Sequence, residues 1–165
     1  MRLQPAAGDR GPPASRLAHA QRALTLCFVL GLLVSPRVLA LDFRSIAPPA
    51  AILYDAPSLK ARKLYILNHG YPVEVLVTLD VWLKVRDAAG ELAWIEAKNL
   101  SAQRVVMVKV ARAEVRRSPD ESAQLAFVAE QDVLLDVIDT ADNWVQVRHR
   151  DGTSGYIRIT QVWGL

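Results

Sequence analysis

Residues Pro72–Ile95, PVEVLVTLDVWLKVRDAAGELAWI, decide the fold of this chain. Short runs rich in Val, Leu and Trp flank turn residues, a pattern that is typical of β-strands. The same pattern returns without a gap 62 residues later in Leu134–Ile157, LLDVIDTADNWVQVRHRDGTSGYI. The duplication therefore predicts two copies of one small β-rich unit within the 165 residues of the chain.

The rest of the sequence after residue 40 also consists of short β-rich runs between turn residues, which predicts an all-β protein. Alternation changes phase near Val110 in the run Arg104–Arg116, RVVMVKVARAEVR, so we expect a bulge or a break there. We expect the strand before this break to close the first unit. The second unit would then lack a closing strand or borrow an edge from its neighbour. The predicted segments are an extended lead-in at 41–49, a first module at 50–110 and a second module at 111–165.

The first forty residues have the pattern of a secretory signal peptide. Four arginines precede the apolar run Ala23–Val34, and compact residues at Val38–Ala40 fit a cleavage site. The alternative is a retained membrane anchor, but the run has 12 residues, whereas a span needs about 20. We therefore expect residues 1–40 to be removed, no membrane span after cleavage, and a periplasmic or secreted protein.

The composition after residue 40 excludes several classes of function. Fifteen of the 20 Lys and Arg residues and 16 of the 17 Asp and Glu residues follow residue 40, which gives a net charge of −1. Because nucleic-acid binding requires a concentrated basic surface, we expect no nucleic-acid partner. This part also has no cysteine for a disulfide. Modules of about 60 residues are marginally stable alone, so we expect the two to pack on each other.

No constellation for catalysis or metal binding is found in the sequence. A nucleophilic mechanism needs a nucleophile beside an oriented base, and the part after residue 40 has only His69 and His149 and no cysteine. These histidines lack the spacing of zinc ligands. We expect a protein without enzymatic activity, cofactor or metal.

Strand periodicity places the aromatic side chains of the duplicated hairpin opposite its aliphatic ones. Trp82 and Lys84 share one face, whereas Leu83 and Val85 share the other. The aliphatic face is predicted to fill the core. The register predicted for the two hairpins is Trp82 opposite Glu96, Lys84 opposite Trp94, Trp144 opposite Arg158, and Gln146 opposite Tyr156.

The outward aromatic residues are the candidate ligand-binding residues. Diagonal neighbours on a sheet come within reach of aromatic rings, so we expect ring pairs between Trp82 and Trp94 and between Trp144 and Tyr156. We also expect Arg158 to stack on Trp144. Two interpretations stay open: a ligand platform, or rings covered by a loop or by the other module. Tryptophan is usually highly buried in proteins, which favours the second.

The order of these motifs resembles the bacterial SH3-type domain. The first copy carries Trp82-x-x-Val-Arg and Gly90-x-x-Ala-Trp-Ile, with Val81 and Ala93 where the family usually has glycine. The second copy is more similar, with Trp144-x-x-Val-Arg and Asp151-Gly-x-x-Gly-Tyr-Ile. The resemblance implies two tandem small SH3-like β-barrels that bind cell-wall material or envelope proteins.

The resemblance favours a cell-envelope binding module that recognises peptidoglycan or another cell-wall component through its aromatic and polar face. A periplasmic protein-interaction or scaffold domain is the alternative. Because the second copy is closer to the family pattern, we expect any ligand surface to centre on Trp144 and Tyr156.

Overall fold

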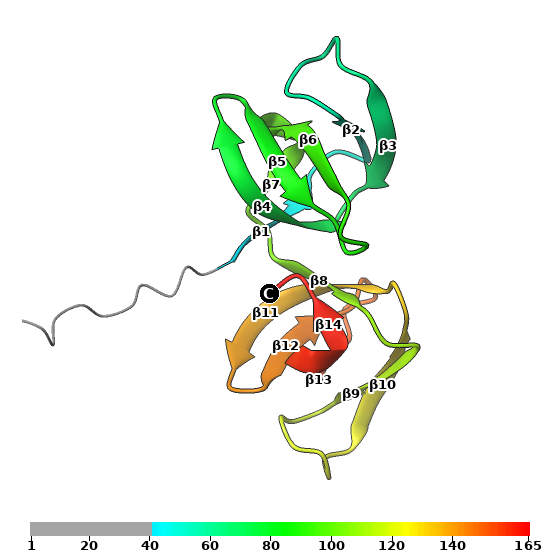
Figure 1. Cartoon of the computed structure of the whole chain (residues 1–165). Helices are drawn as coiled ribbons and strands as arrows, with labels where there is room; N and C mark the ends of the chain where they lie inside the picture. Colours follow the sequence, from blue (N-terminus) through cyan, green and yellow to red (C-terminus); the bar gives the residue numbers. More distant parts are fainter. Residues whose placement is uncertain (1–40) are drawn as a thin grey trace, which may run out of the picture. The chain divides into compact units, whose positions relative to one another are not determined.

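The structure is a computed structural model that describes residues 41–165. The predicted signal peptide and its cleavage site lie outside the described residues. The described part is all-β and consists of two antiparallel sheets, each with seven strands (Figure 1). The all-β prediction is confirmed, whereas closure of each sheet into a barrel stays a prediction.

The first sheet is built by the N-terminal half of the described chain. Its strands are β1 (Asp42–Ile46), β2 (Ala50–Tyr54), β3 (Lys63–Asn68), β4 (Pro72–Leu79), β5 (Trp82–Arg86), β6 (Leu92–Glu96) and β7 (Leu100–Ser101). A 3-10 turn, η2 (Ala97–Asn99), connects the last two strands.

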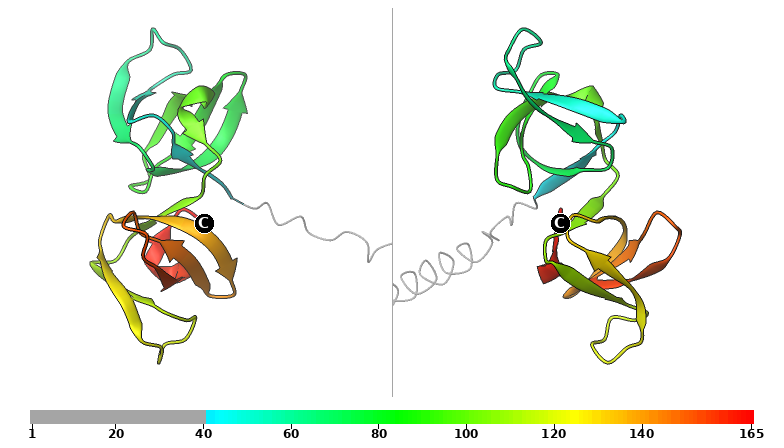
Figure 2. Two further views of the ribbon diagram at one scale, coloured as in Figure 1. Left: turned by 180° about the vertical axis from the view of Figure 1, so that it is seen from behind. Right: turned by 90° about the vertical axis from the view of Figure 1, so that its right-hand side faces the viewer.

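The second sheet repeats this arrangement. Its strands are β8 (Val105–Val108), β9 (Arg112–Arg116), β10 (Leu125–Glu130), β11 (Leu134–Ala141), β12 (Trp144–Arg148), β13 (Ser154–Arg158) and β14 (Val162–Trp163), with the 3-10 turn η3 (Ile159–Gln161) before the last strand. The strand orders are β3-β2-β6-β5-β4-β1-β7 and β10-β9-β13-β12-β11-β8-β14, so the two sheets share one topology. Each sheet curves strongly around its own core (Figure 2).

The structure corrects the predicted role of two segments. The segment expected as an extended lead-in forms β1, which pairs with β4 and β7 of the first sheet. The strand expected to close the first module forms β8, which pairs with β11 and β14 of the second sheet. The second sheet therefore has its own equivalent of β1 and borrows no edge. The phase change near Val110 is a real break, since β8 ends at Val108 and β9 begins at Arg112.

The predicted hairpin register is confirmed in both copies. Trp82 pairs with Glu96 and Lys84 with Trp94 in the first sheet. In the second sheet Trp144 pairs with Arg158, and Gln146 pairs with Tyr156. The aliphatic residues between them are fully buried, as predicted; they are Leu83, Val85, Ile95, Val145, Val147 and Ile157.

Each sheet encloses a separate apolar core. One core is formed around Ile46, Leu53 and Val73, and the other around Val106, Val115 and Leu135. Tight turns connect the central strands, and Asp80 and Asp142 take the left-handed backbone conformation there, each with φ of 52°. Asp tolerates this conformation better than most residues, which explains why it recurs at this turn in both copies.

The described residues, 41–165, form one compact unit. Contacts that link the two sheets include the rings of Phe43 and Trp163, whose centroids are 5.0 Å apart, and a 2.8 Å hydrogen bond from the Gln103 amide to the Asp136 carboxylate. Extensive packing of one module on the other stays a prediction. Within residues 41–165, none of the helical segments has the length and apolar character that crossing a membrane requires.

Candidate functional site

The strongest candidate site is the outer face of the first sheet. Register pairs place Val77 beside Lys84, Lys84 beside Trp94, and Trp94 beside Tyr54, so these side chains follow one another across β4, β5, β6 and β2. Trp82 extends the same face, between Leu79 and Glu96. We call the outward side chains Tyr54, Val77, Leu79, Trp82 and Trp94 the aromatic face.

A bulge in β4 explains how two aliphatic residues join this face. The register of β4 against β5 shifts between Val75 and Val77, so the alternation reverses at Leu76. Before the bulge Val75 pairs with the core residue Val85, whereas after it Val77 pairs with outward Lys84. A one-residue shift exchanges the two sides of a strand, and here it moves an aliphatic side chain to the surface.

Packing within the aromatic face differs from the predicted ring pair. Trp82 packs edge-on against Tyr54, with ring centroids 5.5 Å apart and an interplanar angle of 90°. The expected contact between Trp82 and Trp94 is not among the aromatic pairs of residues 41–165. Edge-to-face packing is the favourable geometry for such rings. Tyr54 is buried, while Trp82 and Trp94 stay half-buried and keep part of their surface available to a ligand.

The neighbouring aliphatic residues are more exposed than the rings. Val77 is 47% exposed, Leu79 is 51% exposed, and Val81 in the following turn is 57% exposed. The matching positions of the second sheet are Asp139, Ala141 and Asn143. Because both sheets fold with the same register, the fold itself does not require apolar residues here. A contiguous exposed apolar surface indicates a binding surface.

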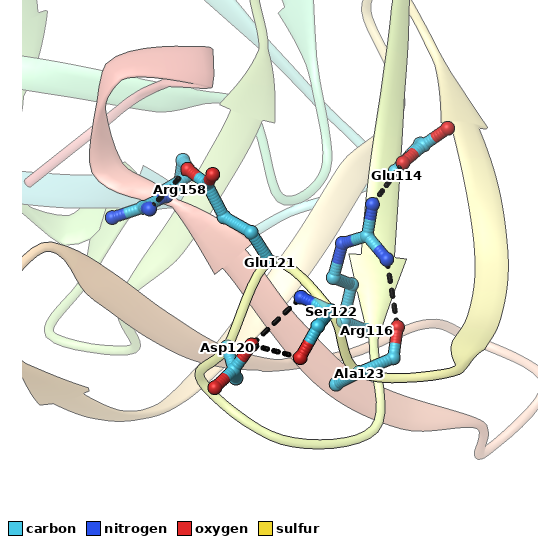
Figure 3. A network of polar contacts seen from close by, with 7 residues as sticks. All are labelled: Glu114, Arg116, Asp120, Glu121, Ser122, Ala123 and Arg158. Carbon is cyan, nitrogen blue, oxygen red and sulfur yellow. Dashed lines mark hydrogen bonds and ion pairs between the residues drawn. The ribbon is translucent and has the colours of Figure 1, made fainter.

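On the equivalent face of the second sheet, the tryptophan that matches Trp82 is covered. Trp144 is only 7% exposed, although strand alternation puts it on the polar side. The Arg158 guanidinium lies over its ring, with Cζ 4.2 Å from the ring centroid, so the predicted stacking is present. Glu121, from the loop between β9 and β10, pairs with Arg158 (Figure 3). The predicted ring pair of Trp144 with Tyr156 is not among the aromatic pairs observed in 41–165.

Polar contacts hold this loop in place (Figure 3). The Arg116 guanidinium donates a 2.7 Å hydrogen bond to the Ala123 carbonyl oxygen and pairs with Glu114. Asp120 accepts hydrogen bonds from the Ser122 hydroxyl at 2.6 Å and from the Ser122 backbone N–H at 2.7 Å. These two bonds lower the pKa of the Asp120 carboxyl. The loop is therefore fixed by its own residues and by Arg116 of β9, and this fixes the position from which Glu121 reaches Arg158.

The residues predicted as ligand-binding are thus distributed unequally. Trp82 and Trp94 lie together on the half-exposed aromatic face, and Tyr156 is half-buried on the outer side of the second sheet. Trp144 lies beneath Arg158, which Glu121 of the loop contacts. Sequence reasoning missed Tyr54, Val77, Leu79 and Glu121. A position-by-position comparison of the two copies would have found Val77, because an aliphatic residue stands where the other copy has Asp139.

Both histidines of the described residues have ordinary structural partners. His69 Nδ1 lies 2.8 Å from the Ala47 carbonyl oxygen, and His149 Nδ1 lies 3.0 Å from the Asp151 carboxylate. In the first sheet, burial raises the pKa of Tyr65, and the nearby Asp87 carboxylate raises it further. In the part of the chain that the structure describes, no group of His, Cys, Asp and Glu residues is arranged to hold a metal ion.

Comparison with known proteins gives a family match for both copies. The family model of the bacterial SH3 domain matches residues 47–102 and again residues 109–164, which together make up most of the chain. No curated protein sequence matches the chain.

Several solved structures show a partial likeness. NlpC2 from Trichomonas vaginalis is 20% identical, with a TM-score of 0.36, over 75% of this chain and 48% of its own. NlpC1 from the same organism is 19% identical, with a TM-score of 0.36, over 78% of this chain and 47% of its own. An NlpC/P60 family protein from Bacillus cereus is 15% identical, with a TM-score of 0.34, over 73% of this chain and 55% of its own. The chain thus spans about half the length of the structures it matches.

Proposed function

This chain belongs to the bacterial SH3 domain family, and we propose that it is a non-enzymatic binding module of the cell envelope. The ligand we propose is peptidoglycan or another cell-wall component, bound on the aromatic face of the first sheet. The observation that carries this proposal is the pair of half-buried rings, Trp82 and Trp94, held on one strand hairpin beside Lys84 and Glu96.

The chemistry of this face suits a wall polymer. Flat aromatic rings offer a large apolar surface at low conformational cost, and sugar rings and peptide segments can pack on them. Lys84 and Glu96 add a hydrogen-bond donor and an acceptor within the same hairpin. Rings mounted on paired strands are held more rigidly than rings on loops, so less freedom is lost on binding.

The proposal includes export of the protein. The basic residues, apolar run and compact residues of segment 1–40 support a cleaved signal peptide, and so a periplasmic or secreted location. There the protein would meet the cell wall. The absence of cysteine after residue 40 means that binding would not depend on disulfide formation in that oxidising compartment.

A pull-down of residues 41–165 on purified cell-wall sacculi tests the proposal. We expect retention at low salt and a severalfold loss of retention for W94A, because Trp94 supplies a half-buried ring with free surface and is not part of the core. Y156A is the matched control, since Tyr156 has the same register position in the second sheet. Absence of retention for the wild type at low salt removes the wall function. Unchanged retention of W94A, or a loss confined to Y156A, would show that the aromatic face is not the binding surface.

A protein-interaction role in the periplasm is the second candidate. The exposed apolar side chains of Val77, Leu79 and Val81 favour it, since surfaces of this kind often bind other proteins. V77D, which installs the residue found in the second sheet, separates the two functions. Loss of an envelope-protein partner with unchanged wall retention would support the interaction role.

A further inference from the structure

The second sheet has a pocket of mostly charged residues next to Trp144 and the loop between β9 and β10. Its volume is about 460 Å³, and it is charged on most sides. Three arginines and two glutamates contribute, so the positive groups outnumber the negative ones. The lining includes Arg112, Glu114, Arg116, Glu121, Trp144 and Arg158.

Arg158 is held ready to bind an anion in this pocket. Its guanidinium lies on the Trp144 ring, and this contact fixes the plane of the group. The side chain is 32% exposed, so its outer N–H groups stay accessible. A guanidinium presents paired donors that match the two oxygens of a carboxylate. The arrangement is therefore a preformed half of an arginine–carboxylate pair.

Glu121 supplies the other half in the present structure. Its carboxylate contacts Arg158 from a loop position where the Glu121 side chain is 76% exposed (Figure 3). Exposed ion pairs contribute little to stability, because water solvates both charges well and both side chains lose freedom. A carboxylate from a ligand could therefore take the place of Glu121 at low cost.

The first sheet shows that this pair is not needed for the fold. With the same register, it has Glu96 in place of Arg158 and Leu59 in place of Glu121. Both members of the pair are thus changed together. Glu96 pairs instead with Lys98, at 2.9 Å, within its own strand end. The arginine and its acidic partner are a property of the second sheet alone.

We propose that Arg158, seated on Trp144, is a carboxylate-binding site, and that Glu121 is an internal occupant which the ligand carboxylate displaces. The ligand class is an acidic peptide. This inference rests on the proposed wall-binding function, because the carboxylates of wall peptides would be the source of the ligand. Each sheet would then bind a different part of the ligand: the aromatic face of the first sheet makes apolar contacts, and Arg158 of the second sheet binds a carboxylate.

Titration with glutarate tests the carboxylate site without any wall material. In ¹⁵N-labelled 41–165, glutarate is expected to shift the Trp144 indole N–H resonance in a saturable way. E121Q should bind with a dissociation constant about two- to fivefold lower, because it removes a competitor of the strength of an exposed ion pair. R158Q, with folding checked by far-UV circular dichroism, should abolish the saturable shift. R158K, which keeps the charge without the paired donors, should weaken it.

Two matched controls make the test specific. Glutaramide has the same length as glutarate but no charge, and E96Q breaks the ion pair with Lys98 at the same register position of the first sheet. We expect no saturable shift with glutaramide and wild-type behaviour from E96Q. The proposal would be overturned if glutarate and glutaramide gave equal shifts. It would also be overturned if E121Q showed no saturable shift with glutarate, or bound glutarate with the same affinity as the wild type.

Sacculi with amidated carboxyl groups then separate this proposal from the proposed function. If amidation lowers retention of the wild type, and less so that of R158Q, the site binds wall carboxylates. Retention that does not depend on amidation leaves wall binding intact and overturns the wall source of the ligand. Glutarate binding without any retention on sacculi overturns the proposed function and leaves an acidic peptide as the ligand class.

Discussion

Replacing Trp144 by alanine is expected to destabilise residues 41–165 by about 3–5 kcal/mol. The indole is 7% exposed and lies under the Arg158 guanidinium. A buried tryptophan removes roughly 150–250 Å² from water, and about 25 cal/mol per Å² gives an upper limit of about 4–6 kcal/mol. The loss includes the contact with Arg158, which contributes about 0.5–1 kcal/mol.

Urea unfolding followed by far-UV circular dichroism measures this loss without relying on tryptophan fluorescence. W82A is the matched control, because Trp82 has the same register position in the first sheet but is only half-buried. Its loss should be clearly smaller. A loss below about 1 kcal/mol for W144A, typical of a surface substitution, would refute the conclusion that the Trp144 ring is buried beneath Arg158.

Three further outcomes follow from the geometry of the second sheet. G155A should lower the free energy of unfolding in urea by about 1–3 kcal/mol, because a Cβ at residue 155 would lie 2.7 Å from the Arg116 carbonyl oxygen. An unchanged free energy of unfolding would show that the two strands move apart easily. D142A should melt below D142G, since φ at residue 142 is 52° and only glycine adopts that conformation without cost, and the reverse order would contradict the turn geometry. Hydrogen bonds from Thr153 and His149 lower the pKa of the Asp151 carboxyl from 3.8 to about 2, so its contribution to stability is complete above the unfolded pKa and is lost as the pH falls through about 2. Between pH 5 and pH 2 the urea midpoint of the wild type should therefore fall further than that of D151N, and parallel curves would exclude this linkage.

Much of the fold could be predicted from the sequence, because strand alternation determines both the register and the buried side. The pairing of Trp144 with Arg158, and the burial of Val145 and Val147, follow directly from the duplicated hairpin. The first strand of each sheet was assigned wrongly. Phe43–Ile46 and the matching Val105–Val108 share little sequence, so the duplication gives no signal there. Their partners are set by tertiary pairing with β4 and β11.

The candidate site could be predicted only in part. Alternation assigns a side chain to a face of a strand, but it does not say what covers that face. Trp144 is covered by the Arg158 guanidinium, which Glu121 contacts from a loop, and the path of that loop could not be predicted from alternation. Val77 is exposed because a bulge reverses the alternation of β4, and no turn residue marks that bulge in the sequence. The preferred surface therefore moves from Trp144 and the second copy to the aromatic face of the first.

The most direct test of the wall-binding proposal is a nuclear magnetic resonance titration of ¹⁵N-labelled 41–165 with soluble peptidoglycan fragments. The indole N–H resonances report on each tryptophan separately, and single Trp-to-Phe variants assign them. If the aromatic face binds the wall, the resonances of Trp82 and Trp94 shift together and saturate at one dissociation constant. If these two resonances stay unchanged while fragments bind elsewhere or do not bind, the aromatic face is not the wall-binding surface.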